Sequence, residues 1–179
     1  LLKLTKRFQN KGAVGTDPVE QLRAAFARAG EPAAKVVALL NDSVGTLAGG
    51  RYTDPAVELG VILGTGTNAA YVETATSVPK LDAAAANSLR GGRVVVNTEW
   101  GGFADDSLPT LDADRELDAA TPHAGEQLME KQMSGMYLGE VARRLLVSLA
   151  SSGVLFSGRV PKRLAEPGCV TTAHVARCD

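Results

Sequence analysis

The hydrophobic and polar positions along the chain mix helical and strand spacing, as in an α/β protein. An N-cap candidate followed by a proline predicts a helix that starts after Asp17 and ends at Gly30. A continuous apolar run at 36–40 has strand length, so we expect a strand that ends just before Asp42. The polar residues around Asp42 can cap a short helical segment, which the glycine pair at 49–50 is expected to stop.

The middle of the chain predicts a hairpin and the later part a long helix. Strand-like runs at 57–63 and 69–72 are separated by a glycine-rich turn, as in a β-hairpin. Residues 77–93 are rich in Ala, Asn, Ser and Gly and predict a surface excursion before another strand at 94–96. Residues 125–151 place apolar side chains at mostly helical spacing, which predicts one helix with a buried face.

Composition narrows the classes of partner and location. A chain of 179 residues with 45% hydrophobic residues can bury a core, and a net charge of -1 gives no electrostatic reason to expect nucleic acid or a membrane surface. The two cysteines, Cys169 and Cys178, suggest neither a disulfide framework nor a zinc site. These features favour a cytoplasmic location, with organelle association left open. Because the chain opens on an apolar segment at Leu1, we expect a fragment.

Polar side chains suited to a sugar lie near the boundaries of the predicted elements. Phosphoryl transfer to an alcohol needs a carboxylate that accepts the hydroxyl proton, and groups that hold acceptor and phosphates in line. Sugar hydroxyls are held best by side chains that donate and accept in pairs. Taken alone, however, residues 41–43 are typical of a helix N-cap and residues 64–68 of a hairpin turn.

Five sequence blocks turn these separate candidates into one pattern. They are 4–6 (LTK), 40–47 (LNDSVGTL), 62–73 (ILGTGTNAAYVE), 97–101 (NTEWG), and 125–131 (GEQLMEK) followed by 134–140 (SGMYLGE). In sequence and order these blocks resemble the hexokinase family, most closely its plant and algal members. The resemblance extends from about residue 2 to about residue 165.

The resemblance implies a fold and an activity. The fold is the two-lobed, actin-like ATPase (ribonuclease H-like) architecture of hexokinases, present in part, with residues 1–40 ending the small domain and 41–179 opening the large one. The activity is phosphoryl transfer from ATP to the 6-hydroxyl of a hexose, the first step of glycolysis. Glucose is the expected hexose, and fructose and mannose are further candidates. ATP and Mg²⁺ are the implied cofactors, and no metal ligand is assigned to this chain.

The resemblance also implies roles for particular residues. Asp42 is the general base, and Lys6 assists at the same sugar. The residues implied to contact the hexose are Thr5, Lys6, Asn41, Asp42, Asn68, Glu99, Gln127 and Glu130. Those implied to approach the ATP phosphates are Gly64, Thr65, Gly66 and Thr67.

Some positions depart from the family pattern. Arg7 stands where glycine is usual, Ser43 replaces threonine but keeps a hydroxyl, and His123 with Ala124 replaces Asn-Pro. The family's upstream phosphate loop and later adenosine loop are not found in the 179 residues, so we expect an incomplete nucleotide site. Two alternatives therefore stay open: a non-catalytic hexose sensor that reports to a protein partner, and an inert truncation.

Overall fold

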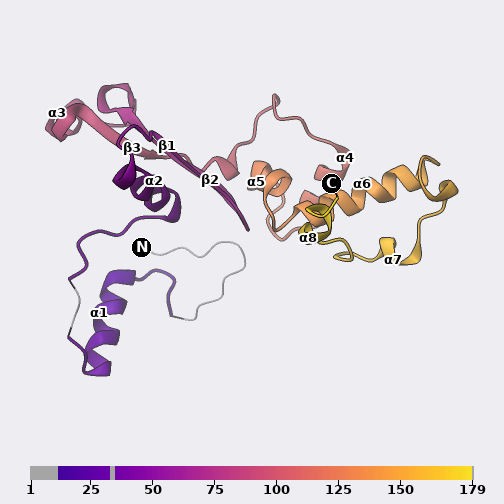
Figure 1. Cartoon of the computed structure of the whole chain (residues 1–179), viewed down its shortest axis with the longest axis horizontal. Coiled ribbons are helices and arrows are strands. Elements are labelled where there is room, and N and C mark those ends of the chain that lie inside the picture. The colour runs from indigo at the N-terminus through magenta and orange to yellow at the C-terminus, as the bar shows by residue number, and fades with distance from the viewer. Residues whose placement is uncertain (1–11, 33–34, 179) are drawn as a thin grey trace. The chain divides into compact units, whose positions relative to one another are not determined.

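The computed structural model describes residues 12–32 and 35–178. Within it the chain divides into two compact units, with the boundary along the sequence between Asn41 and Asp42. Figure 1 shows the elements of both units along the chain.

The first unit contains the helix α1 (Pro18–Ala29), as the sequence predicts. Asp17 caps it, because its Oδ1 accepts the backbone N–H of Val19 at 2.8 Å. Gly30 ends the helix in the left-handed conformation, with a φ of 70° that glycine adopts without strain. The sequence signals at its two ends are therefore sufficient to predict where this helix begins and ends.

The predicted strand at 36–40 is wrong. Residues 35–41 form no regular secondary structure, and Val37 is 83% exposed. A strand is stable only when its N–H and C=O groups pair with a neighbour, and the described residues of the first unit contain no second strand. Asp42 consequently follows an irregular segment rather than the end of a strand.

The second unit is built on a three-stranded antiparallel sheet in the order β1-β2-β3. Its strands are β1 (Leu59–Leu63), β2 (Thr67–Thr74) and β3 (Arg93–Asn97). The predicted hairpin is confirmed as β1 and β2, although β2 already begins at Thr67. In the register of the sheet, Ala70 lies opposite Asn97, so the start of β2 lies beside the end of β3.

The helix α2 (Asp42–Thr53) packs against the sheet, as Figure 1 shows. The approach is close because Gly60 of β1 has no side chain: a Cβ there would lie 2.8 Å from the backbone nitrogen of Leu47. Leu47 is 1% exposed and forms part of the core beneath the helix. The glycine pair at 49–50 does not stop α2, contrary to the prediction. Packing of Gly50 against Val57 supports the helix beyond the glycines.

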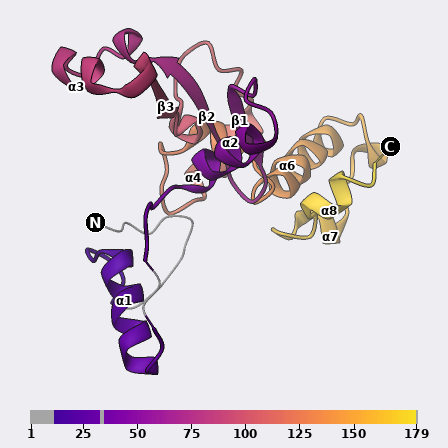
Figure 2. The ribbon, with the colours of Figure 1, turned by 60° about the vertical axis from the view of Figure 1, so that its left-hand side comes forward.

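The rest of the second unit is mainly helical. Short 3₁₀ turns lie at Ala75–Ser77, Arg90–Gly92, Trp100–Gly102 and Phe156–Gly158. The helices are α3 (Ala83–Ser88), α4 (Asp112–Ala119), α5 (Leu128–Met133), α6 (Leu138–Ser151), α7 (Lys162–Ala165) and α8 (Thr172–Val175). The longest, α6, contacts α4, α7 and α8, and Figure 2 shows α7 and α8 alongside it. In the part of the chain that the structure describes, no helix is long and apolar enough to cross a membrane.

The single helix predicted for residues 125–151 is wrong, because the chain leaves helical geometry between α5 and α6. At this break the backbone N–H of Gly135 donates to the carbonyl of Gly64 at 2.7 Å. The N–H of Met136 donates to the carbonyl of Thr65 at 3.3 Å. A continuous helix would use these N–H groups internally, so contact with the hairpin turn replaces one helical turn.

Candidate functional site

A cluster of polar side chains surrounds Asn68, at the start of β2. The Nδ2 of Asn68 donates to Oδ1 of Asn97 at 2.8 Å, to Oγ of Ser43 at 3.0 Å and to Oε1 of Glu99 at 3.2 Å. The amide has only two hydrogens for these three acceptors, so the bonds are shared. The antiparallel register brings Asn68 beside the end of β3, and the first turn of α2 brings Ser43 to both.

Ser43 connects this cluster to the predicted base. Its side chain is fully buried, and its hydroxyl donates to Oδ1 of Asn97 at 3.2 Å while it accepts from Asn68. Its backbone N–H donates to Oδ1 of Asp42 at 2.9 Å. Asp42 is exposed at the first position of α2. The exposed carboxylate is thus held next to the cluster by a residue that is itself fixed in it.

A second group of side chains lies around Thr67, the residue that precedes Asn68. Glu130 is 5% exposed, and its Oε2 accepts the backbone N–H of Thr67 at 3.0 Å. The hydroxyl of Thr67 accepts the indole N–H of Trp100 at 2.9 Å. At Gly101 a Cβ would lie 2.8 Å from Oε1 of Gln127 and 3.1 Å from Cβ of Glu130. The backbone at Gly101 therefore packs directly on these two side chains.

The two groups form one site because their members are neighbours in sequence. Thr67 precedes Asn68, and Glu99 precedes Trp100 and Gly101. Four predicted sugar contacts from three separate blocks, namely Asn68, Glu99, Gln127 and Glu130, thereby gather around the start of β2. We call these four residues the sugar-site quartet.

Backbone strain marks two members of the quartet. Glu99 has a φ of 50° and Gln127 a φ of 54°, the left-handed region that non-glycine residues rarely adopt. Such conformations cost of order 1–3 kcal/mol each and persist where the surroundings hold them in place, often at binding sites. The strain supports a functional use of both side chains.

The predicted phosphate loop forms the turn of the hairpin. The N–H of Gly64 donates to the carbonyl of Gly66 at 2.9 Å, and Thr65 is exposed. Thr67 differs from Gly64 and Thr65, because it is 3% exposed and both its N–H and its hydroxyl bond within the protein. Gly66 is buried as well, so the exposed Gly64 and Thr65 offer more room for a phosphate than Gly66 and Thr67 do.

Three further predicted sugar contacts are not part of this cluster as described. Thr5 and Lys6 are outside the described residues, and Asn41 belongs to the first unit. Ser43 and Asn97, which hold the cluster together, were not among the predicted contacts. Their positions in the blocks at 40–47 and 97–101 were the available signal. Among the described residues, no group of three or more His, Cys, Asp or Glu side chains is arranged to hold a metal ion.

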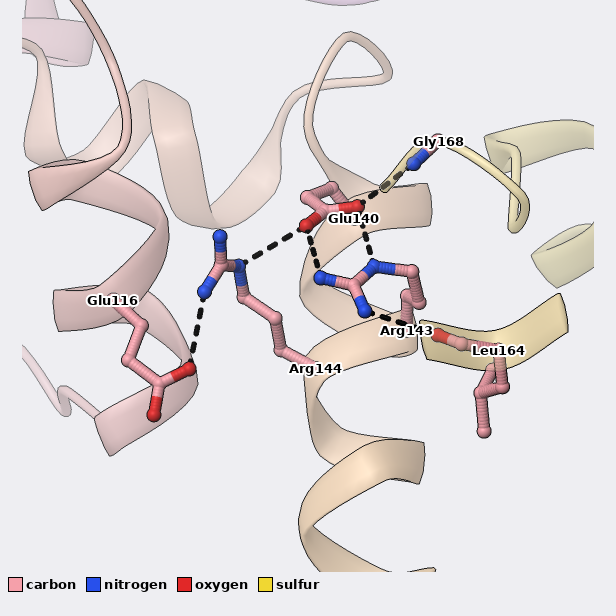
Figure 3. Close-up of polar contacts among 6 residues, drawn as sticks. All are labelled: Glu116, Glu140, Arg143, Arg144, Leu164 and Gly168. Atoms are coloured by element: carbon pink, nitrogen blue, oxygen red, sulfur yellow. Dashed lines mark hydrogen bonds and ion pairs between the residues drawn. The ribbon is translucent and has the colours of Figure 1, made fainter. Parts of the chain in front are cut away.

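Away from the quartet, Glu140 of α6 anchors the segment that follows this helix. Figure 3 shows its carboxylate between the guanidinium groups of Arg143 and Arg144. The carboxylate also accepts the N–H of Gly168 at 3.2 Å, while Arg143 donates to the carbonyl of Leu164 at 3.0 Å. This network ties α6 to α7 and the loop after it.

The network predicts a pH dependence of stability. The pKa of Glu140 is lowered, chiefly by hydrogen bonds from Arg143, and burial only partly opposes this effect. A carboxyl group with a lowered pKa in the fold stabilises it above the unfolded pKa, and this stabilisation is lost as the pH falls through the folded value. The free energy of unfolding of the wild type should therefore exceed that of Glu140→Gln. The difference should be largest above about pH 5 and smaller below about pH 4. Urea denaturation across this range measures the difference, and a difference that is constant down to pH 2 would contradict the assignment.

Solved structures identify the class of fold. A hexokinase from Schistosoma mansoni in complex with glucose superimposes with a TM-score of 0.76 at 37% identity, over 96% of this chain and 38% of that one. A second hexokinase crystal structure superimposes with a TM-score of 0.63 at 40% identity, over 88% of this chain and 31% of that one. The chain is thus an α/β protein that contains part of the actin-like ATPase fold of these enzymes, as predicted.

Sequence comparison identifies the family. Two models, both described as Hexokinase, match residues 1–52 and 58–179. Hexokinase-5 of Oryza sativa subsp. japonica is 48% identical over 98% of this chain, and Hexokinase-1 of Arabidopsis thaliana is 47% identical over the same share. The chain belongs to the hexokinase family. It covers 34% and 35% of these two relatives, so it spans about a third of their length.

Proposed function

We propose that the protein containing this chain transfers a phosphoryl group from ATP to the 6-hydroxyl of a hexose such as glucose. The observation that carries the proposal is the gathering of the sugar-site quartet beside Asp42, through the bonds of Ser43. Amide and carboxylate side chains in this arrangement can donate to and accept from several ring hydroxyls at once. The glucose complex of the Schistosoma mansoni relative supports the choice of hexose.

In this proposal Asp42 accepts the proton of the 6-hydroxyl while the quartet holds the other hydroxyls. A base must be accessible to the substrate yet fixed in position, and Asp42 is exposed while its Oδ1 accepts the N–H of the buried Ser43. Thr5, Lys6 and Asn41 would complete the hexose contacts, with Lys6 assisting at the reacting hydroxyl. Residues 1–40 would then end the small domain and 41–179 open the large one.

The nucleotide would meet this chain at the hairpin turn of Gly64, Thr65 and Gly66, of which Gly64 and Thr65 are exposed. Backbone N–H and hydroxyl groups in such a turn can donate to anionic oxygens. Magnesium prefers phosphate oxygens and water together with one or two carboxylates. It would therefore arrive with the phosphates and neutralise their charge.

The hexose site is tested by removing its central amide. In the full-length protein that contains this sequence, Asn68→Ala should raise the hexose dissociation constant about 10-fold or more, because it deletes the donor shared by three partners. Calorimetric titration with glucose measures the change. Asn87→Ala, at an exposed position of α3, is the matched control and should leave the affinity unchanged.

Three outcomes would contradict the proposal in whole or in part. Equal glucose affinity in wild type and Asn68→Ala would remove the cluster from the hexose site. Glucose binding without ADP formation from Mg-ATP would remove the kinase and favour the non-catalytic hexose sensor. A full-length wild type that neither binds nor phosphorylates a hexose would contradict the proposed activity itself.

A further inference from the structure

A buried ion pair joins α4 to α5 outside the predicted hexose contacts. The Nζ of Lys131 lies 2.5 Å from Oδ1 of Asp118, and the two side chains are 5% and 20% exposed. Lysine is almost never buried unless it is paired, and an apolar pair of similar volume often stabilises a fold equally well. Stability alone therefore does not explain why two charges occupy this position.

The pair also holds the loop between the two helices at two backbone positions. Lys131 donates from Nζ to the carbonyl of His123 at 2.6 Å. The carboxylate of Asp118 accepts the N–H of Gly125, at 3.0 Å and 2.9 Å from its two oxygens. An apolar pair could not make these bonds, because the carbonyl needs a donor and the N–H needs an acceptor, and the charges of Lys131 and Asp118 strengthen both bonds.

The restrained loop leads directly to Gln127. Gly125 lies two residues before it, and Gln127 has the strained left-handed conformation that its surroundings must maintain. On the other side of Gln127, Lys131 follows Glu130 in α5, and Glu130 bonds to Thr67. The ion pair thus fixes the chain on both sides of two quartet members, Gln127 at the N-cap of α5 and Glu130 within it.

The charge of Asp118 is suited to this task. Burial by itself raises the pKa of Asp118, but hydrogen bonds from Lys131 and from the N–H of Gly125, together with the charge of Lys131, lower it below its ordinary value. The carboxylate is therefore ionised at neutral pH, and both of its bonds stay in place.

We propose that Asp118 and Lys131 are positioning residues, whose ion pair sets Gln127 and Glu130 in the geometry that binds the hexose. The inference rests on the proposed function, because it assigns a task within the hexose site. Neither residue touches the hexose in this proposal. Each acts through the backbone of the loop and through α5.

The test separates hexose affinity from turnover in the full-length protein that contains this sequence. Lys131→Met removes the cation and places an uncharged side chain at the buried position. It should raise both KM and Kd for glucose about 10-fold, because small displacements of positioned groups have large effects. The KM for ATP should stay within about twofold and kcat within about threefold. Lys131→Arg, which keeps the cation, should restore most of the glucose affinity.

Glu140→Gln is the matched control. Glu140 and Arg143 form a similarly buried pair, with side chains 19% and 9% exposed, and also hold two backbone groups, but far along the chain from Gln127. This variant should lower Tm as Lys131→Met does, yet keep the glucose Kd within about twofold. Asp118→Asn combined with Lys131→Met should bind glucose no more weakly than Lys131→Met alone, because the pair acts as one unit.

Two results with Lys131→Met and its control, and a third with a replacement variant, would overturn the inference while the proposed function stands. One is an unchanged glucose Kd in Lys131→Met with a lowered Tm, which would make the pair purely structural. The other is an equal loss of glucose affinity in Glu140→Gln. If Lys131→Met does not fold, Asp118→Glu keeps both charges but alters the arm length, and unchanged glucose affinity in that variant also overturns it. A wild type that binds no glucose overturns the proposed function itself.

Discussion

Asp42→Asn in the full-length protein should lower kcat for hexose phosphorylation by about 10²- to 10⁴-fold, the usual contribution of a general base. The amide cannot accept the proton of the 6-hydroxyl, but its oxygen can still accept the N–H of Ser43, so the start of α2 is preserved. The glucose dissociation constant should change by less than about threefold. Coupled detection of ADP and calorimetric titration measure the two quantities.

A matched control lies just past the other end of α2. Asp54 is also exposed, and its Oδ1 accepts the backbone N–H of Ala56 at 2.9 Å. Asp54→Asn should leave both kcat and glucose affinity unchanged. Turnover retained in Asp42→Asn would remove Asp42 from the mechanism, whereas a similar loss in both variants would point to a general effect of charge.

The second large effect is expected on stability. Gly139 lies inside α6, where alanine would normally be favoured, but a Cβ there would lie 2.5 Å from the carbonyl oxygen of Val170 and 2.6 Å from the carbonyl carbon of Thr171. Backbone atoms cannot rotate away as a side chain does. Gly139→Ala should therefore lower the free energy of unfolding by about 3 kcal/mol.

Gly49→Ala provides the opposite expectation. Gly49 is also a helix-interior glycine, in α2, but a Cβ there would meet no atom within 4 Å. This substitution should raise the stability by up to about 1 kcal/mol. Thermal unfolding of the two variants beside wild type measures both shifts. If Gly139→Ala melts at or above the wild-type temperature, the close contact between α6 and the segment before α8 is not present.

The elements that the sequence predicted correctly depend on local signals. The cap at Asp17 and the stop at Gly30 lie within the helix they define, and the hairpin is defined by its own turn. The failures depend on distant contacts. The break between α5 and α6 arises because Gly135 bonds to Gly64, a residue 71 positions earlier whose carbonyl no helical pattern reveals. The apolar run at 36–40 has strand composition but no partner strand within the described part of its unit.

The same distinction applies to the site. Residue types and block order were enough to predict four residues that the structure gathers around the start of β2, because each lies in a recognisable block. They did not reveal that Ser43 is the link between Asn68 and Asp42, since that link depends on how α2 packs on the sheet. Asp118 and Lys131 lie 13 positions apart, and only the folded loop between them shows their shared task.

The contacts around the hairpin turn have a consequence for how the two substrates influence each other. Glu130 bonds to Thr67 at one end of the turn, and Gly135, five residues later, bonds to Gly64 at the other. On the proposed assignment, one short stretch of chain touches both the acceptor site and the donor site. A hexose that restrains α5 would also restrain the turn that contacts the phosphates. The first ligand to bind would then order this stretch, and the second would bind without that loss of conformational entropy. Thermodynamic linkage then requires each substrate to raise the affinity for the other by the same factor.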